Sequence, residues 1–131
     1  MKNNEIIVPV STGELIDKIS ILKIKKKKIK NKSKLKNILK ELLLLNKILQ
    51  NNFKNNKKIS LYEKKLTQIN RKLWDIEDKI RDLEAKKIFN KQFINLARSV
   101  YITNDKRSEI KKKINLLTGS DIKEEKSYKS Y

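Results

Sequence analysis

All four arginines of the chain and its single tryptophan lie in one segment, from Arg71 to Arg107. Elsewhere the positive charge is carried by lysine, which makes up the rest of the 34 basic residues. We interpret this bias as the imprint of an AT-rich genome, in which lysine replaces other polar residues wherever the position tolerates it. An arginine retained in such a chain indicates a need for its planar fork of N–H donors, which can bind a carboxylate or a phosphate at two points.

These arginines fall into two groups. Arg71 and Arg81 each have an acidic residue four positions away. On a helix, that spacing allows an ordinary surface ion pair that stabilises the helix by a few tenths of a kcal/mol. Arg98 and Arg107 have no acidic residue three or four positions away. Their partners must come from another helix or from a ligand.

The elements that position these residues are predicted to be helices. Apolar residues recur every three or four positions, and the chain has only 2 Gly and 1 Pro, a composition typical of long helices. Ser11 and Glu14 form a capping-box pattern, Ser60 and Glu63 form a second one, and Ser33 and Asn90 are further candidate caps. Gly119 has the residue type that ends helices in the left-handed conformation. We therefore predict helices over 12–30, 34–50, 61–86 and 91–117.

Four helices with short connections predict an all-α fold, namely a four-helix antiparallel bundle made of two long helical hairpins. A short extended N-terminal arm precedes it, and residues 1–119 form one domain. The polar C-terminal tail, 120–131, is expected to be partly disordered. The third helix carries an unbroken heptad seam from Tyr62 to Leu83, typical of a coiled coil. The seam also permits a homodimer or another protein partner.

A hairpin turning at residues 86–90 places residues of its two helices side by side when their numbers sum to about 177. On this register we expect ion pairs between Arg98 and Asp78 and between Arg71 and Asp105. Arg107 lies far from the turn, where acids of the first helix can reach it. The predicted polar network, or anion site, comprises Glu14, Asp17, Arg71, Trp74, Asp78, Arg81, Arg98, Tyr101, Asn104, Asp105 and Arg107.

The formal net charge of +19 raises the alternative of nucleic-acid or other polyanion binding. Residues 20–40 contain ten lysines and no acidic residue, whereas residues 71–109 contain ten basic and seven acidic residues. The lysine-rich stripe within residues 20–40 has no aromatic residue to stack on bases and no arginine. Nucleic acid is therefore a possible partner but not the favoured one. The predicted stripe comprises Lys23, Lys25, Lys26, Lys27, Lys28 and Lys30.

Several kinds of chemistry need residues or motifs that this sequence does not contain. The chain has no His and no Cys, so a histidine proton shuttle, a zinc set and a disulfide are excluded. It has no glycine-rich phosphate loop, and we expect no cofactor, no metal and no catalytic residue. The longest strongly apolar run, Leu42–Leu45, is far shorter than a membrane span, so we expect a soluble, cytoplasmic protein. The missing residues favour a non-catalytic interaction or scaffold module over a small helical enzyme, without deciding the point.

Three motifs carry a resemblance to a known family. They are the stretch from Val8 to Ile19, the segment Leu73–Asp78 with Ile80 and Arg81, and the segment from Leu96 to Asp105. Together they resemble an uncharacterised family of short bacterial and phage proteins, a domain of unknown function, and the match extends over most of the chain. The resemblance implies no activity, cofactor or catalytic residue. Glu14–Ile19 is also similar to the first helix of all-helical chorismate mutases, a fold that binds a dianion with arginines.

Overall fold

The computed structural model describes residues 4–131, and these form four helices and no strand. The helices are α1 (Thr12–Lys28), α2 (Lys32–Phe53), α3 (Lys57–Ala85) and α4 (Lys91–Thr118). The predicted all-α, four-helix fold is confirmed. Residues 4–10 form an exposed segment before α1, and Ser11, which caps the helix, is buried. No helix among the described residues combines the length and the apolar content needed to span a membrane.

Asparagines, rather than serines, start three of the helices. Asn31, Asn56 and Asn90 each accept a hydrogen bond from the backbone N–H three residues ahead. The predicted caps at Ser33 and Ser60 are therefore wrong. The connection between the second and third helices, predicted as residues 51–60 by the helix bounds, is shorter and spans residues 54–56. Ser11 caps α1 as predicted, and Asn90 caps α4. Gly119 ends α4 with φ 62°, in the left-handed conformation that glycine adopts without strain.

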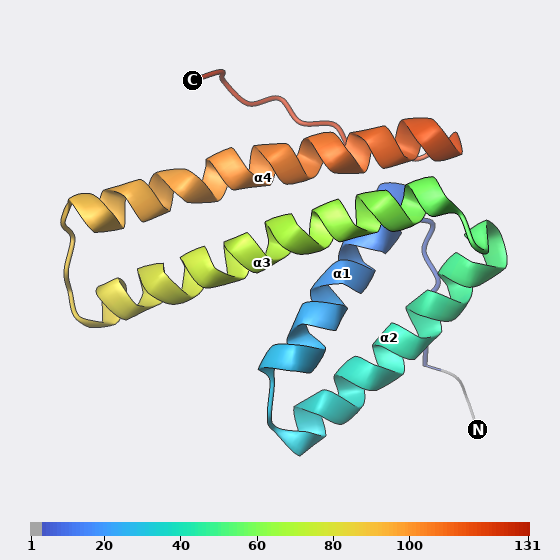
Figure 1. Ribbon diagram of the computed structural model, residues 1–131, viewed down its shortest axis with the longest axis horizontal. Helices are drawn as coiled ribbons and strands as arrows, with labels where there is room; N and C mark the ends of the chain where they lie inside the picture. The colour runs from blue at the N-terminus through green and yellow to red at the C-terminus, as the bar shows by residue number, and fades with distance from the viewer. Residues whose placement is uncertain (1–3) are drawn as a thin grey trace.

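The helices form two antiparallel hairpins that cross at a steep angle (Figure 1). Helix α1 lies at the centre, because it contacts each of the other three helices. Its fully buried side chains Ile16 and Ile19 meet Leu66 of α3 and Ile114 of α4 in one apolar core. The turn end of the α3–α4 hairpin projects beyond α1 and α2 (Figure 1). We call this projecting part, residues 76–101, the arm.

The C-terminal tail, residues 120–131, has no helix or strand and runs back along α4 (Figure 1). Ser120 Oγ accepts a hydrogen bond from the backbone N–H of Thr12 (3.4 Å). At the far end, Tyr131 Oη donates to a carboxylate oxygen of Asp105 (2.5 Å). The tail thus contacts both the start of α1 and the middle of α4.

Candidate functional site

A carboxylate buried at the centre of the fold anchors the site. Asp17 is 1% exposed, and a buried charge is unfavourable unless it is paired and hydrogen-bonded. Arg107 of α4 supplies a fork, in which Nε donates to Oδ1 (2.9 Å) and Nη2 donates to Oδ2 (2.5 Å). Asn70 of α3 donates to Oδ1 from Nδ2 (2.9 Å). One side chain of α1 is thereby joined to both helices of the other hairpin.

Ser20 completes the link between α1 and α3. Its hydroxyl is fully buried, donates to the backbone carbonyl of Asp17 (2.7 Å) and accepts from Asn70 Nδ2 (2.7 Å). No buried side-chain nitrogen or oxygen atom among the described residues lacks a hydrogen-bond partner. The buried part of the site is therefore a satisfied network, which contributes rigidity.

A buried lysine joins the same network one helical turn beyond Arg107. Lys111 is 7% exposed, and its Nζ lies 2.7 Å from a Glu14 carboxylate oxygen and 4.0 Å from one of Asp17. A third carboxylate, that of Glu124 in the tail, lies 3.4 Å away. The hydrogen bonds from Arg107 to Asp17 raise the pKa of its guanidinium, and burial opposes this only in part. Carboxylates thus lie against both cations.

Glycine allows the two helices to approach closely at this point. The backbone N–H of Gly13 donates to Asn115 Oδ1 (2.7 Å). A Cβ atom on Gly13 would lie 2.6 Å from the backbone oxygen of Lys111, closer than carbon and oxygen can approach. The first turn of α1 can therefore sit against α4 only without a side chain at residue 13.

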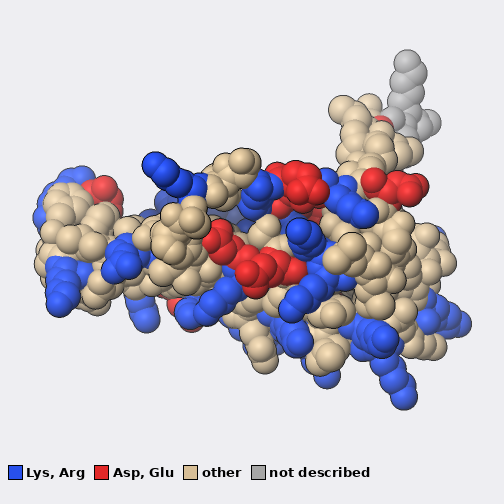
Figure 2. Space-filling view, turned by 90° about the horizontal axis from the view of Figure 1, so that it is seen from above, with Lys and Arg blue, Asp and Glu red and all other residues tan. Residues whose placement is uncertain are grey.

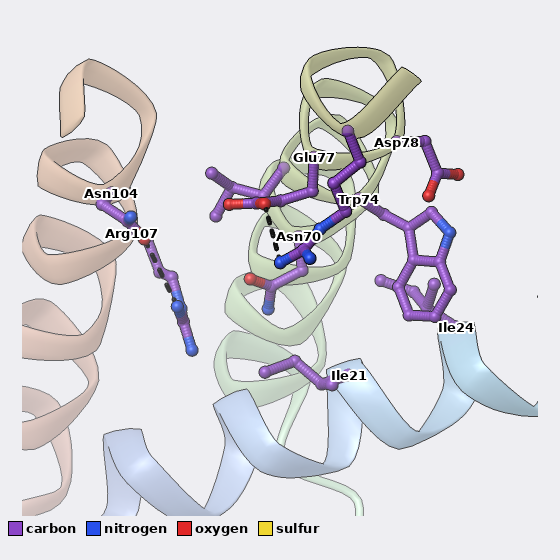
Figure 3. A pocket seen from close by; sticks show the side chains of 10 residues that line it. Ile21, Ile24, Asn70, Trp74, Glu77, Asp78, Asn104 and Arg107 are labelled. Carbon is purple, nitrogen blue, oxygen red and sulfur yellow. Dashed lines mark hydrogen bonds and ion pairs between the residues drawn. The ribbon is translucent and has the colours of Figure 1, made fainter. Parts of the chain in front are cut away.

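The structure brings part of the predicted network together. Glu14, Asp17 and Arg107 meet as expected, and Asn104 Oδ1 accepts a hydrogen bond from Arg107 Nη1 (3.3 Å). A cleft of about 410 Å³ adjoins them between α1, α3 and α4 (Figure 3). The predicted residues Trp74, Asp78, Arg81, Asn104 and Arg107 line it, together with Ile21, Ile24, Asn70, Leu73 and Glu77.

The two predicted cross-helix ion pairs are absent from the described residues. Arg98 is exposed, and its Nε lies 3.4 Å from Tyr101 Oη instead of near Asp78. Asp105 accepts from Tyr131 rather than pairing with Arg71. Each of these charged residues lies two positions from an inward-facing one, such as Ile76 or Thr103. They share a height along the hairpin with their predicted partners but point away from them.

Of the two ion pairs predicted within the third helix, one is present and one is not. Arg81 lies 3.4 Å from Glu77, which confirms the predicted helix-surface pair. Asp75, the acid four residues after Arg71, instead lies 4.0 Å from Lys28 of α1. In the lysine stripe, Lys23 pairs with Glu63 of α3. The remaining lysines of the stripe, Lys25, Lys26, Lys27 and Lys30, have no ion pair within the described part of the chain.

Sequence reasoning missed Ser20, Asn70, Lys111 and Glu124. One signal was available, since Lys111 follows Arg107 by four residues and so occupies the same face of α4. Asn70 follows Leu66 of the seam by the same spacing. Among the described residues, no group of three or more acidic side chains is placed to hold a metal ion.

A protein-family model matches residues 6–131, which is nearly the whole chain. The chain belongs to this family, DUF6165, a family of unknown function. The predicted membership of an uncharacterised family is thereby confirmed. Neither the curated proteins nor the solved structures give a significant match to this chain. The function of this DUF6165 protein must therefore be argued from its own residues.

Proposed function

We propose that this DUF6165 protein is a non-catalytic interaction module whose buried Asp17 network sets the angle between its two hairpins. The observation that carries this proposal is that the buried carboxylate of Asp17 is fully paired by side chains of the protein itself. Asp17 is 1% exposed and accepts three hydrogen bonds from two different helices. Buried polar groups of this kind have their best-attested role in fixing the register and arrangement of helices.

The charges of the network also argue for an internal role. Three carboxylates, those of Glu14, Asp17 and Glu124, surround two cations, Arg107 and Lys111. The protein as a whole has a net charge of +19, so this excess of acid is a local exception. Seen from the α4 side, a group of Asp and Glu side chains lies near the middle of the face, with Lys and Arg on both sides (Figure 2). In the network, Glu14, Asp17 and Glu124 pair with Arg107 and Lys111 inside the protein.

The arm is the surface best suited to the interaction. It exposes Ile88, Phe89 and Ile94 at 38%, 56% and 54%, and no other helix covers it at its turn end (Figure 1). It carries six basic and four acidic residues, so it holds little of the net charge of +19. Two copies could pack apolar surface here with far less electrostatic repulsion than elsewhere. The partner proposed for the arm is therefore a second copy of this chain.

Sedimentation equilibrium of the full chain at about 100 μM tests this proposal. We expect a mass of twice 15.5 kDa, reduced to the monomer by Phe89→Asp. The matched control is Leu43→Asp, which introduces the same charge at a leucine of α2 that is 74% exposed. The control should leave the mass unchanged. A monomer at this concentration, or equal loss of dimer in both variants, would contradict the arm as the contact surface.

Polyanion binding by the lysine stripe is a second candidate, supported by the exposure of Lys26, Lys27 and Lys30. Such binding should be steeply salt-dependent. We expect a Lys26→Gln/Lys27→Gln variant to bind a fluorescent single-stranded oligonucleotide more weakly at low salt, while Lys112→Gln/Lys113→Gln on α4 does not. Absence of binding in the parent protein at low salt would remove this function.

A further inference from the structure

The C-terminal tail and α4 border a cleft that has no part in the function proposed above. Its volume is about 560 Å³, larger than that of the cleft between α1, α3 and α4. The tail is held over it at Tyr131, whose hydroxyl bonds to Asp105 and whose ring packs edge-on against Tyr101, with centroids 5.1 Å apart. The cleft is lined by Val100, Tyr101, Asn104, Asp105, Arg107, Lys126, Tyr128, Lys129 and Tyr131.

Positive charge dominates this lining. Arg107, Lys126 and Lys129 face one side-chain carboxylate among the lining residues, that of Asp105, and Tyr131 already donates a hydrogen bond to it. Lys126 Nζ lies 3.7 Å from Glu124, whereas Lys129 has no ion pair within residues 4–131. This balance contrasts with the acid-rich network on the other side of Arg107, and it favours an anion in the cleft.

Unused hydrogen-bond donors point to the same ligand class. A guanidinium carries five N–H donors, and Arg107 uses three, two on Asp17 and one on Asn104. Asn104 accepts that bond through Oδ1, and its Nδ2 has no acceptor in the described part of the protein. Donors without acceptors suit the oxygens of a phosphate or a carboxylate.

The remaining walls are flat and largely apolar. Tyr101, Tyr128 and Tyr131 present aromatic rings, and Val100 adds an aliphatic surface. Tyrosine side chains suit a ligand that has a ring beside a charged group, because the ring packs while the hydroxyl remains polar. We propose that this cleft binds a small organic anion in which a phosphate or carboxylate is attached to a flat apolar group. The tail forms one wall of the site.

This inference does not depend on self-association through Ile88, Phe89 and Ile94, because none of these residues lines the cleft. Val100 and Tyr101, the last residues of the arm, are the only part of it that reaches the cleft among the described residues. The two proposals also differ in their readouts, which are ligand affinity and molecular mass.

Isothermal titration calorimetry with three probes tests the cleft. Phenyl phosphate carries both ring and charge, inorganic phosphate carries charge alone, and benzyl alcohol carries the ring alone. We expect phenyl phosphate to bind one site per chain, about tenfold more tightly than inorganic phosphate, since ring stacking of this kind contributes on that order. Benzyl alcohol should not bind measurably. Equal affinity for phenyl phosphate and inorganic phosphate, or no binding of either, would overturn the proposal.

Variants separate the cleft from the general positive charge. Lys129→Ala should weaken phenyl phosphate binding about fivefold, the upper end for an exposed ion pair. Tyr101→Ala should remove most of the preference over inorganic phosphate. Lys113→Ala, an exposed lysine of α4 outside the cleft, is the matched control and should change nothing. If Lys113→Ala weakens binding as much as Lys129→Ala does, the binding is nonspecific and the proposal fails.

Discussion

The Arg107→Lys variant tests the network that joins the two hairpins. Lysine keeps the positive charge but presents one ammonium group in place of a fork. At least one of the two hydrogen bonds to Asp17 is then lost, and so is the bond to Asn104. A hydrogen bond to a charged group contributes about 1.5–3 kcal/mol. Because the Arg107 side chain is 26% exposed, water replaces part of this, and we expect a net loss of about 2 kcal/mol.

The assay is reversible thermal or urea unfolding followed by circular dichroism at neutral pH. For a domain of this size, about 2 kcal/mol corresponds to a fall in Tm of roughly 6–10 °C. The control is Arg98→Lys, the same substitution at an exposed arginine of the same helix, which should change stability by less than about 0.5 kcal/mol. Combining Arg107→Lys with Asp17→Asn should give a coupling energy above about 1 kcal/mol. If the two lysine variants have equal Tm values, Arg107 does not stabilise the fold in the way described.

Three further predictions concern the surroundings of this network. Gly13→Ala should destabilise the protein by about 2–3 kcal/mol in urea unfolding, because its Cβ meets the backbone of Lys111 at 2.6 Å; unchanged stability would show that α1 can move away without loss. Asn70→Ala should cost about 1–3 kcal/mol by the same measurement, because two buried acceptors lose their donor; a loss under about 0.5 kcal/mol would contradict this. The bond from Tyr131 to Asp105 raises the tyrosine pKa from 10.0 to about 12, so any stability it adds is complete below pH 10.0 and is lost as the pH rises through about 12. Ultraviolet titration should show one of the four tyrosines ionising late, and Asp105→Ala should abolish this delay.

Helix content and the central ion pair could be predicted from the sequence because both depend on periodicity. Arg107 follows Thr103 by four residues and precedes Ile110 by three, so it belongs to the inward face of α4. Its missing local acid then required a partner on another helix, and Asp17 is that partner. Trp74 and Asn104, which were both predicted to belong to the network, line the same cleft.

The two predicted cross-helix ion pairs that are absent show what the hairpin register cannot predict. Residue numbers that sum to a constant give the height of two residues along a hairpin but not the direction of their side chains. Arg98 and Asp78 have matching heights, and each lies two residues from an inward position, which turns it to the outer surface. The roles of Asn70 and Ser20 depended on how steeply the hairpins cross, which no local pattern encodes. The contacts of the C-terminal tail could not be inferred either, because they join residues that are far apart in the sequence.

The separation of Asp17 and Arg107 along the chain, 90 residues, has a consequence for biosynthesis. Translation produces α1 first, yet its carboxylate has no cationic partner until the second half of α4 has been made. A nascent chain that buried α1 against α2 and α3 alone would leave a charge in the core without its counterion, so early collapse around α1 is disfavoured. The α3–α4 hairpin, by contrast, is built from neighbouring segments and can form quickly. The helix at the centre of the molecule is therefore the first to be synthesised and the last to be fixed in place.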